Sequence, residues 1–195
     1  VKTIETLLEW AKKFPNATYV ITPKYDGLSV GMSSTNSWTR GDGNIGQECT
    51  LHVDTIFQKP EIEEGDTVRG EIIITNRDWK RFVKINEKAK SQRNSATGLI
   101  NGDFDKDRMA EYSLLTIKPY EIMGSNMNKD KQLMALMEED FVIINDINKL
   151  TEKYLLSLFM KWRKKFPIDG IVIDVKENEY RHGVEANGNP SYTVA

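Results

Sequence analysis

Cysteine, histidine and long apolar runs are all scarce in this chain of 195 residues. Its single cysteine, Cys49, excludes a disulfide framework. We therefore expect a packed thiol and a reducing compartment, the cytoplasm. No apolar run approaches the roughly 20 residues of a membrane-spanning helix, so we expect no membrane contact.

An excess of positive charge is also lacking. Lysine and arginine total 27 residues against 29 aspartates and glutamates, which leaves a formal net charge of -2. This balance excludes a chain-wide basic field of the kind that holds nucleic acid. Any contact with DNA must come from local patches or from domains outside this sequence.

Hydrophobic periodicity predicts an alternation of helices and strands with no regular βαβ rhythm. Thr3 is placed as an N-cap for the first helix, Asn76 caps a later one, and 93–103 is too rich in small and turn residues for a long helix. The pattern favours an α+β fold of antiparallel β-sheets flanked by helices. The expected helices are 4–14, 47–57, 76–90 and 151–165, and the expected strands are 18–22, 28–32, 67–75, 113–123 and 168–175.

The segment GDGNIG at 41–46 has the letters of the dinucleotide fingerprint G-x-G-x-x-G. That fingerprint needs a buried strand before it and an acidic residue about 20 residues after it. Residues 36–40 make a poor buried strand, and no βαβ unit follows them. We expect a glycine-rich turn with another purpose.

The turn KYDG at 24–27 offers a candidate nucleophile, Lys24. A lysine attacks through its neutral amine, which partial burial behind an apolar strand favours. Asp26 can orient the amine or bind a sugar hydroxyl, and Gly27 permits a close approach of the backbone to a ligand. Four letters alone favour the simpler interpretation, an exposed lysine in a type I turn.

Two predicted strands carry charged residues that a buried strand tolerates only with a partner or a function. VRGE at 68–71 puts Arg69 and Glu71 on one face, and IDGIVIDV at 168–175 opens with Asp169 and Gly170. A solvent-facing strand edge is the simpler interpretation of each. Beside a lysine turn, a nucleotide or anion pocket explains them better.

Five motifs in order, KYDG, TRGDGNIG, VRGE, RNSATG and IDGIVIDV, resemble the nucleotidyltransferase domain of NAD-dependent DNA ligases over nearly the whole chain. The resemblance implies the fold shared by DNA ligases and mRNA-capping enzymes. It implies that Lys24 takes AMP through a phosphoramidate bond, in a motif completed by Tyr25, Asp26 and Gly27.

The same resemblance assigns further residues to the nucleotide. Arg40 matches an arginine at the nucleotide, and Arg93 one that serves the phosphate or the nicotinamide side. Glu71 matches a glutamate that contacts the ribose and helps to place Mg²⁺. Tyr120 falls where the family has a tyrosine stacked on adenine, and Asp169 begins the later strand motif.

The chain also departs from the family pattern. Thr22 stands where the family has a glutamate, and Asp174 where it has a lysine. Lys176 lies on the same strand face as Asp174 and is expected to reach the phosphate instead. The Asn-Val-Arg of the family is replaced at 52–54, and an arginine is missing near Asn101. These changes indicate a divergent branch of the family, with a virus as one source. The resemblance thus implies the cytoplasm of a bacterium or of the host cell of a virus.

The resemblance favours NAD over ATP as the AMP donor, because Ser29 occupies a position where ATP-dependent ligases carry arginine. Mg²⁺ is the implied metal and nicked double-stranded DNA the implied partner of the full enzyme. An ATP-dependent DNA or RNA ligase domain and a catalytically degenerate nucleotide-binding subunit remain alternatives.

The organisation that follows is one adenylation domain over 1–195, a fragment of a longer multidomain ligase. The chain begins without Met and ends on SYTVA, which resembles the middle of a strand. The OB-fold and DNA-clamping domains are absent from it. We expect a monomeric enzyme that has additional ligase domains, with a second subunit as the alternative.

Several other residues receive structural interpretations only. His52 and His182 have no partner spacing for a metal and are expected at the surface. Met134 and Met137 lie at helical spacing and are expected in the core. The basic cluster within 161–165 suits a solvated helix end, with a DNA-backbone patch as the alternative.

Overall fold

The computed structural model describes residues 3–41, 46–184 and 189–195. The chain forms two compact units, which we describe separately. Unit 1 consists of Val1–Lys24, Asn126–Arg163 and Ile168–Ala195, and unit 2 of Tyr25–Ser125 and Lys164–Pro167. The first crossing between them falls at the peptide bond between Lys24 and Tyr25, inside the KYDG turn.

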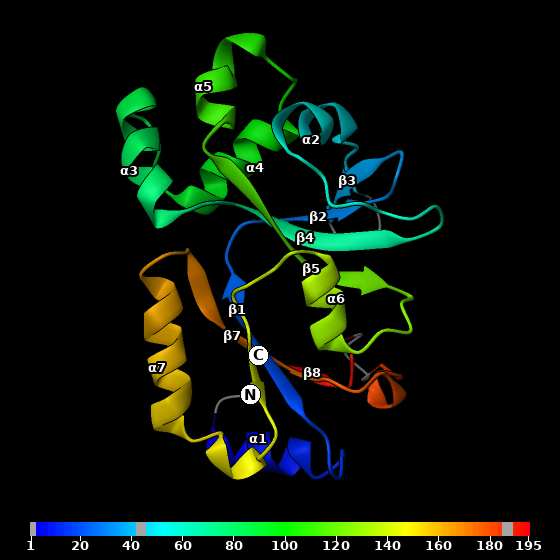
Figure 1. The fold of residues 1–195 in the computed structure, drawn as a ribbon. Helices are drawn as coiled ribbons and strands as arrows, with labels where there is room; N and C mark the ends of the chain where they lie inside the picture. Colours follow the sequence, from blue (N-terminus) through cyan, green and yellow to red (C-terminus); the bar gives the residue numbers. More distant parts are fainter. Residues whose placement is uncertain (1–2, 42–45, 185–188) are drawn as a thin grey trace. The chain divides into compact units, whose positions relative to one another are not determined.

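Unit 1 is built on a four-stranded sheet in the order β6-β1-β7-β8 (Figure 1). Its strands are β1 (Tyr19–Tyr25), β6 (Val142–Ile144), β7 (Ile168–Val175) and β8 (Thr193–Val194). Its helices are α1 (Ile4–Ala11), α6 (Lys129–Ala135) and α7 (Glu152–Arg163), with 3₁₀ turns at Ile147–Lys149 and Asn178–Tyr180. Helix α1 begins as predicted, because the Thr3 side chain accepts a hydrogen bond from the Thr6 N–H at 3.3 Å.

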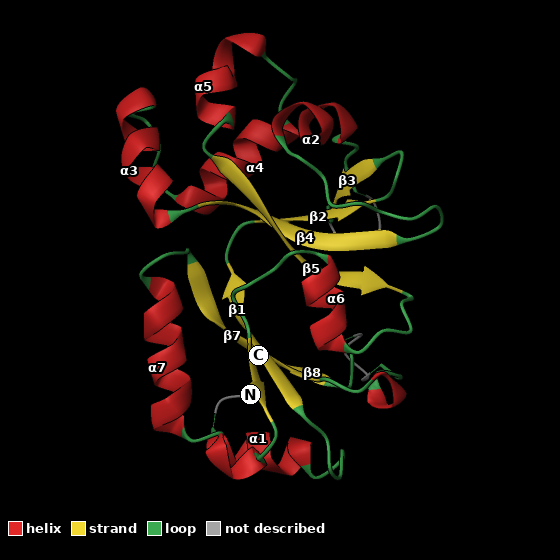
Figure 2. Ribbon diagram, in the orientation of Figure 1, coloured by secondary structure: helices red, strands yellow, loops and turns green. Residues whose placement is uncertain are grey.

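Unit 2 is built on a second four-stranded sheet, in the order β3-β2-β4-β5 (Figure 2). Its strands are β2 (Leu28–Met32), β3 (Ser37–Thr39), β4 (Thr67–Ile74) and β5 (Leu115–Met123), all paired antiparallel. Its helices are α2 (Thr50–Ile56), α3 (Asn76–Ile85), α4 (Gln92–Asn101) and α5 (Met109–Tyr112), with a 3₁₀ turn at Lys106–Arg108. The predicted α+β class with antiparallel sheets is confirmed.

Alternation along β4 shows why this sheet has one apolar and one polar face. Val68, Ile72 and Ile74 are buried, whereas Arg69 is exposed and Glu71 half-buried. The buried set packs where α4 contacts β2 and β4. The polar set is therefore displayed on the opposite face of the sheet in unit 2.

Two local predictions in unit 2 are wrong. Segment 92–101 forms a ten-residue helix, α4, although it is rich in small residues. The side chain of Ser91 caps it by accepting from the Asn94 N–H, and burial of Leu99 and Ile100 outweighs weak helix propensity. Helix α3 is capped by Thr75, not Asn76, because the Thr75 hydroxyl accepts from the Asp78 N–H.

Two expectations about exposure are also wrong. His52 is buried, with its ring edge-on to Phe104 and Tyr112 at 5.3 and 5.8 Å between ring centroids. Met134 and Met137 are exposed, because the buried stripe of this segment passes through neighbouring positions instead. Cys49 is packed in the interior as expected.

Within the described ranges, none of the helices combines the length and the apolar character that crossing a bilayer requires. The basic residues at the end of α7 are exposed, as expected for a solvated helix end.

Candidate nucleotide site

Lys24 lies at the end of unit 1 and is held by an ion pair with Asp169. Its Nζ is 2.8 Å from both carboxylate oxygens of Asp169. The two side chains are 44% and 48% exposed, so Lys24 is reachable from solvent and not partly buried as the sequence suggested. A Cβ at Gly170 would meet the Lys24 side chain at 3.7 Å, an ordinary van der Waals contact, so this position does not require glycine for space.

The two divergent strand positions, Thr22 and Asp174, are both buried in unit 1. The Asp174 carboxylate accepts from the Thr193 hydroxyl at 2.6 Å and from Arg181 Nη1 at 3.2 Å. Lys129 Nζ lies 3.6 Å from its other oxygen. Asp174 therefore neutralises two buried cations, which is a structural task that a lysine at this position would not perform.

Lys176 is placed at the opposite end of β7 from Asp169. Its backbone N–H donates to the Thr18 carbonyl at 2.8 Å, whereas Asp169 pairs with Lys24, so β1 and β7 run in opposite directions. Seven residues of strand separate Lys176 from Asp169, or roughly 23 Å at about 3.3 Å per residue. Lys176 therefore does not lie beside Lys24, and the expectation that it replaces the missing lysine there has no support in unit 1.

In unit 2, a row of polar side chains crosses the open face of the sheet. Ser29, Glu71 and Lys118 are directly opposite one another on β2, β4 and β5, and we call them the inner row. Directly opposed residues of antiparallel strands share a face. Arg40 adjoins this row at the sheet edge, because its N–H donates to the Ser29 carbonyl at 3.1 Å.

Tyr120 joins the inner row through a β-bulge. The register between β4 and β5 shifts between Arg69 and Gly70, which makes Tyr120 the extra residue. Its ring is half-buried, and its hydroxyl is hydrogen-bonded with the Ser29 side chain. Burial raises the pKa of the Tyr120 hydroxyl, so this residue is a neutral ring at physiological pH.

The remainder of the KYDG motif is fixed to the same face. The Gly27 N–H donates to Glu71 Oε1 at 3.2 Å, and Arg93 Nη1 donates to Asp26 Oδ1 at 3.1 Å. A Cβ at Gly27 would lie 2.2 Å from the Ile72 carbonyl oxygen. Glycine is therefore required where this turn crosses β4.

Tyr25 forms a small aromatic cluster behind the motif. Its ring lies edge-on to Phe166 at 5.4 Å between centroids. The Lys118 ammonium sits over both rings, 5.7 Å from the Tyr25 centroid and 4.9 Å from that of Phe166. Such cation–π contacts hold the lysine of the inner row in place.

A cavity of about 310 Å³ in unit 2 includes Asp26 and Arg93 in its lining. Lys90 and Trp79 also line it, together with the first turn of α4. Backbone N–H groups at a helix start favour anions. The cavity thus joins two predicted site residues in surroundings that suit a phosphate.

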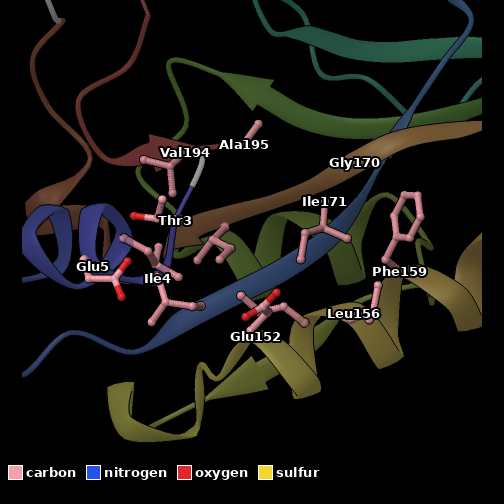
Figure 3. Close-up of a pocket in the computed structure, with 13 residues that line it drawn as sticks. Thr3, Ile4, Glu5, Glu152, Leu156, Phe159, Gly170, Ile171, Val194 and Ala195 are labelled. Carbon is pink, nitrogen blue, oxygen red and sulfur yellow. The ribbon is translucent and has the colours of Figure 1, made fainter.

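A second cavity, of about 530 Å³, lies in unit 1 and contains none of the predicted binding side chains (Figure 3). Residues of α1, α7, β7 and β8 line it, among them Ile4, Leu156, Phe159 and Ile171. Its lining is mainly apolar, with Glu5 and Glu152 also present. The predicted nucleotide residues therefore gather elsewhere.

Some predictions cannot be placed. Residues 42–45 of the GDGNIG segment lie outside the described residues. Within the described ranges, no group of three or more His, Cys, Asp or Glu residues is arranged to hold a metal ion. Glu71, the predicted metal ligand, is the carboxylate that lies on the inner row.

Sequence reasoning missed one feature of this face. Trp38 stands two residues before Arg40 on β3, and it lies directly opposite Gly31. The alternation W-x-R was available as a signal, because residues two apart on a strand point to the same side.

Comparison with known proteins agrees with this arrangement. Residues 2–195 match the family of the NAD-dependent DNA ligase adenylation domain. The chain is 30% identical over 203 residues to the DNA ligase of Acanthamoeba polyphaga mimivirus, covering 96% of this chain and 30% of that protein. It is 32% identical over 211 residues to the DNA ligase of Leptospira biflexa serovar Patoc, covering 97% and 31%. The chain thus spans about a third of the length of these relatives.

A solved structure described as "DNA binding with a minimal scaffold: Structure-function analysis of Lig E DNA ligases" has a similar fold. The TM-score is 0.53 at 13% sequence identity, over 85% of this chain and 58% of that one. This likeness concerns the fold alone, whereas the sequence match extends over nearly every residue. The chain belongs to the NAD-dependent DNA ligase adenylation domain family.

Proposed function

We propose that this chain forms a covalent lysyl-AMP on Lys24, with NAD as the AMP donor, for later transfer to a 5′-phosphate at a DNA nick. The observation that carries the proposal is the pair formed by Lys24 and Asp169, 2.8 Å apart, in a member of this family. The pair presents an accessible amine together with a carboxylate that can accept its proton.

The Lys24 ammonium transfers a proton to Asp169, and the neutral amine attacks the α-phosphorus of NAD. A nitrogen–phosphorus bond forms, and the bond from that phosphorus to the bridging oxygen breaks. Nicotinamide mononucleotide leaves with the bridging oxygen, and the second proton of the attacking amine passes to solvent.

We propose nucleotide-binding roles for residues of unit 2. Glu71 receives the ribose hydroxyls, Tyr120 offers its neutral ring to the adenine, and Arg40 and Arg93 face the phosphates. Asp26 positions Arg93 through their 3.1 Å contact. Phosphate charge is best stabilised by such preorganised donors, because they need no rearrangement during the reaction.

The site suits Mg²⁺ only if the substrate phosphates supply part of its ligands. The described residues contain no cluster of three metal-binding side chains. Mg²⁺ commonly binds through one or two carboxylates together with substrate phosphates. Glu71 is the carboxylate we assign to it, where the ion would neutralise charge on the phosphate oxygens.

Label transfer tests the proposal. The complete protein is incubated with Mg²⁺ and either NAD or ATP carrying radiolabel in the adenylate phosphate, then denatured and separated on a gel. We expect label from NAD that is lost in Lys24→Ala. Lys12→Ala is the matched control, because Lys12 also pairs with a carboxylate of unit 1, that of Glu9, and should leave labelling unchanged.

The outcomes separate the alternatives. Label from ATP alone would overturn the NAD assignment and favour an ATP-dependent ligase. A folded protein that takes label from neither donor would favour a degenerate nucleotide-binding subunit. Sealing of nicked DNA by the complete protein then tests the later steps, and native mass measurement tests whether it acts as a monomer.

A further inference from the structure

A second row of side chains crosses the open sheet face of unit 2 beside the inner row. Trp38, Gly31, Arg69 and Glu121 are directly opposite one another on β3, β2, β4 and β5, and we call them the outer row. Gly31 and Arg69 lie two residues along their strands from Ser29 and Glu71, and Trp38 lies two residues before Arg40. Glu121 lies three residues after Lys118, because the β-bulge adds Tyr120 between them. The two rows therefore share one face, roughly 7 Å apart at about 3.3 Å per residue.

The Trp38 ring lies close to the backbone of Gly31, its directly opposed neighbour on β2. A Cβ at Gly31 would lie 2.7 Å from atoms of the indole ring. An aromatic ring opposite a strand glycine shields the backbone beneath it, and here the side of the ring that faces the sheet covers Gly31. Gly31 thus lets the ring lie close to the sheet.

The ring remains accessible to solvent. Trp38 is 36% exposed, whereas Trp10 and Trp162 are 5% and 2% exposed. Among the Phe, Tyr and Trp side chains of residues 3–41, 46–184 and 189–195, Trp38 is exposed and the others are buried or half-buried. The exposed side of the ring is therefore available for stacking against a planar partner.

Arg69 supplies a cation on the same row as this ring, on the other side of Gly31. Its Nη1 is 3.6 Å from Glu121 Oε2, and this ion pair orients the guanidinium. The Arg69 side chain is still 48% exposed. A flat aromatic surface combined with an accessible guanidinium is the usual platform for an unstacked base and its phosphate.

We propose that Trp38 and Arg69 form a stacking subsite for one nucleotide of the DNA strand at the nick. The inference rests on the proposed function, because it places this nucleotide next to the AMP-binding inner row. The base stacks on the outer side of the Trp38 ring, and Arg69 contacts the adjoining phosphate.

The test uses the complete ligase and two substitutions that both keep Gly31 covered. Trp38→Met removes the ring but retains an apolar side chain, and Trp38→Phe retains a ring. For a nicked duplex, we expect Trp38→Met to raise the Kd by about 5- to 100-fold, the usual range for loss of one stacked base. Trp38→Phe should recover most of this loss.

The arginine has an independent readout. We expect Arg69→Gln to weaken binding and to reduce the slope of log Kd against log salt by about one phosphate contact. Arg77→Gln is the matched control, because Arg77 is also exposed and paired with a carboxylate, Asp78, in the same unit. It should leave both the Kd and the slope unchanged.

Label transfer from NAD distinguishes failure of the subsite from failure of the proposed function. Absence of label on the wild-type protein would overturn the proposed function itself. If wild-type protein labels normally but the Kd for nicked DNA is equal in wild type and Trp38→Met, the subsite is overturned. A raised KM for NAD with unchanged DNA binding also overturns it, because the ring would then serve NAD.

Discussion

Replacing Asp169 by asparagine tests whether this carboxylate accepts the proton of Lys24, as proposed. The substitution keeps the size of the side chain and one oxygen, but removes the negative charge that lies 2.8 Å from the Lys24 ammonium. An amide cannot take the proton that the amine must lose before it attacks. The change therefore affects one chemical role and little of the packing.

The structure predicts two effects of very different size. Loss of a positioned general base slows a reaction by about 10²- to 10⁴-fold. The ion pair itself is 44% and 48% exposed, so solvent screens it and its removal should cost less than about 1 kcal/mol of unfolding free energy. For a domain of this size that is a Tm change below about 4 °C.

Both quantities are measured on the complete protein. Single-turnover labelling from NAD gives the rate of adenylation, and thermal unfolding gives the Tm. Glu9→Gln is the control, because it removes the carboxylate of another exposed lysine pair in unit 1, that with Lys12. It should alter neither the rate nor the Tm appreciably.

A rate for Asp169→Asn within about threefold of wild type would refute the general-base argument. A large fall in Tm accompanied by a proportionate loss of labelling would assign Asp169 a structural role instead. Only slow labelling in a normally stable protein agrees with the geometry.

Three further substitutions test the remaining structure. Gly27→Ala should lower the unfolding free energy by roughly 1–3 kcal/mol, because its Cβ would meet the Ile72 carbonyl; chemical denaturation measures this. Asp174→Asn should cost about 3–5 kcal/mol by leaving the Arg181 guanidinium buried without its counter-charge, again read from denaturation. Burial lowers the pKa of His52 in the folded protein, so as pH falls this side chain is protonated in the unfolded chain before it is in the folded one. The unfolding free energy should therefore fall as pH drops below about 6.5, and His52→Phe should flatten that dependence.

Each of these has a control in the same chain. Gly98→Ala lies in helix α4 with open space around it and should stabilise the protein slightly. Asp54→Asn removes an exposed ion pair with Lys59 and should cost little. His182→Gln, at an exposed position, should leave the pH dependence intact. Equal effects in any test variant and its control would contradict the corresponding structural explanation.

The amino-acid sequence by itself determined the fold class, the principal strands and the order of the site motifs. β4 and β7 were predictable because runs of β-branched residues with period-two polarity identify a strand locally. Lys24, Glu71 and Tyr120 were identified by spacing and resemblance, which depend on residue order alone.

Only the tertiary structure decided what each side chain contacts. Helix α4 forms against weak propensity because Leu99 and Ile100 are buried, and His52 is interior because two aromatic rings surround it. Propensity and periodicity describe neighbours along the chain, whereas burial depends on residues distant in sequence.

Contacts between residues distant in sequence also decide the roles of Asp174 and Lys176 in unit 1. Sequence alternation placed Asp174 and Lys176 on one face but could not reveal that Arg181, Lys129 and Thr193 engage the aspartate. Nor could it show that Lys176 lies beside Thr18, far along β7 from Lys24. Strand pairing and register, which are long-range properties, decide which charges meet and therefore which can act on a nucleotide.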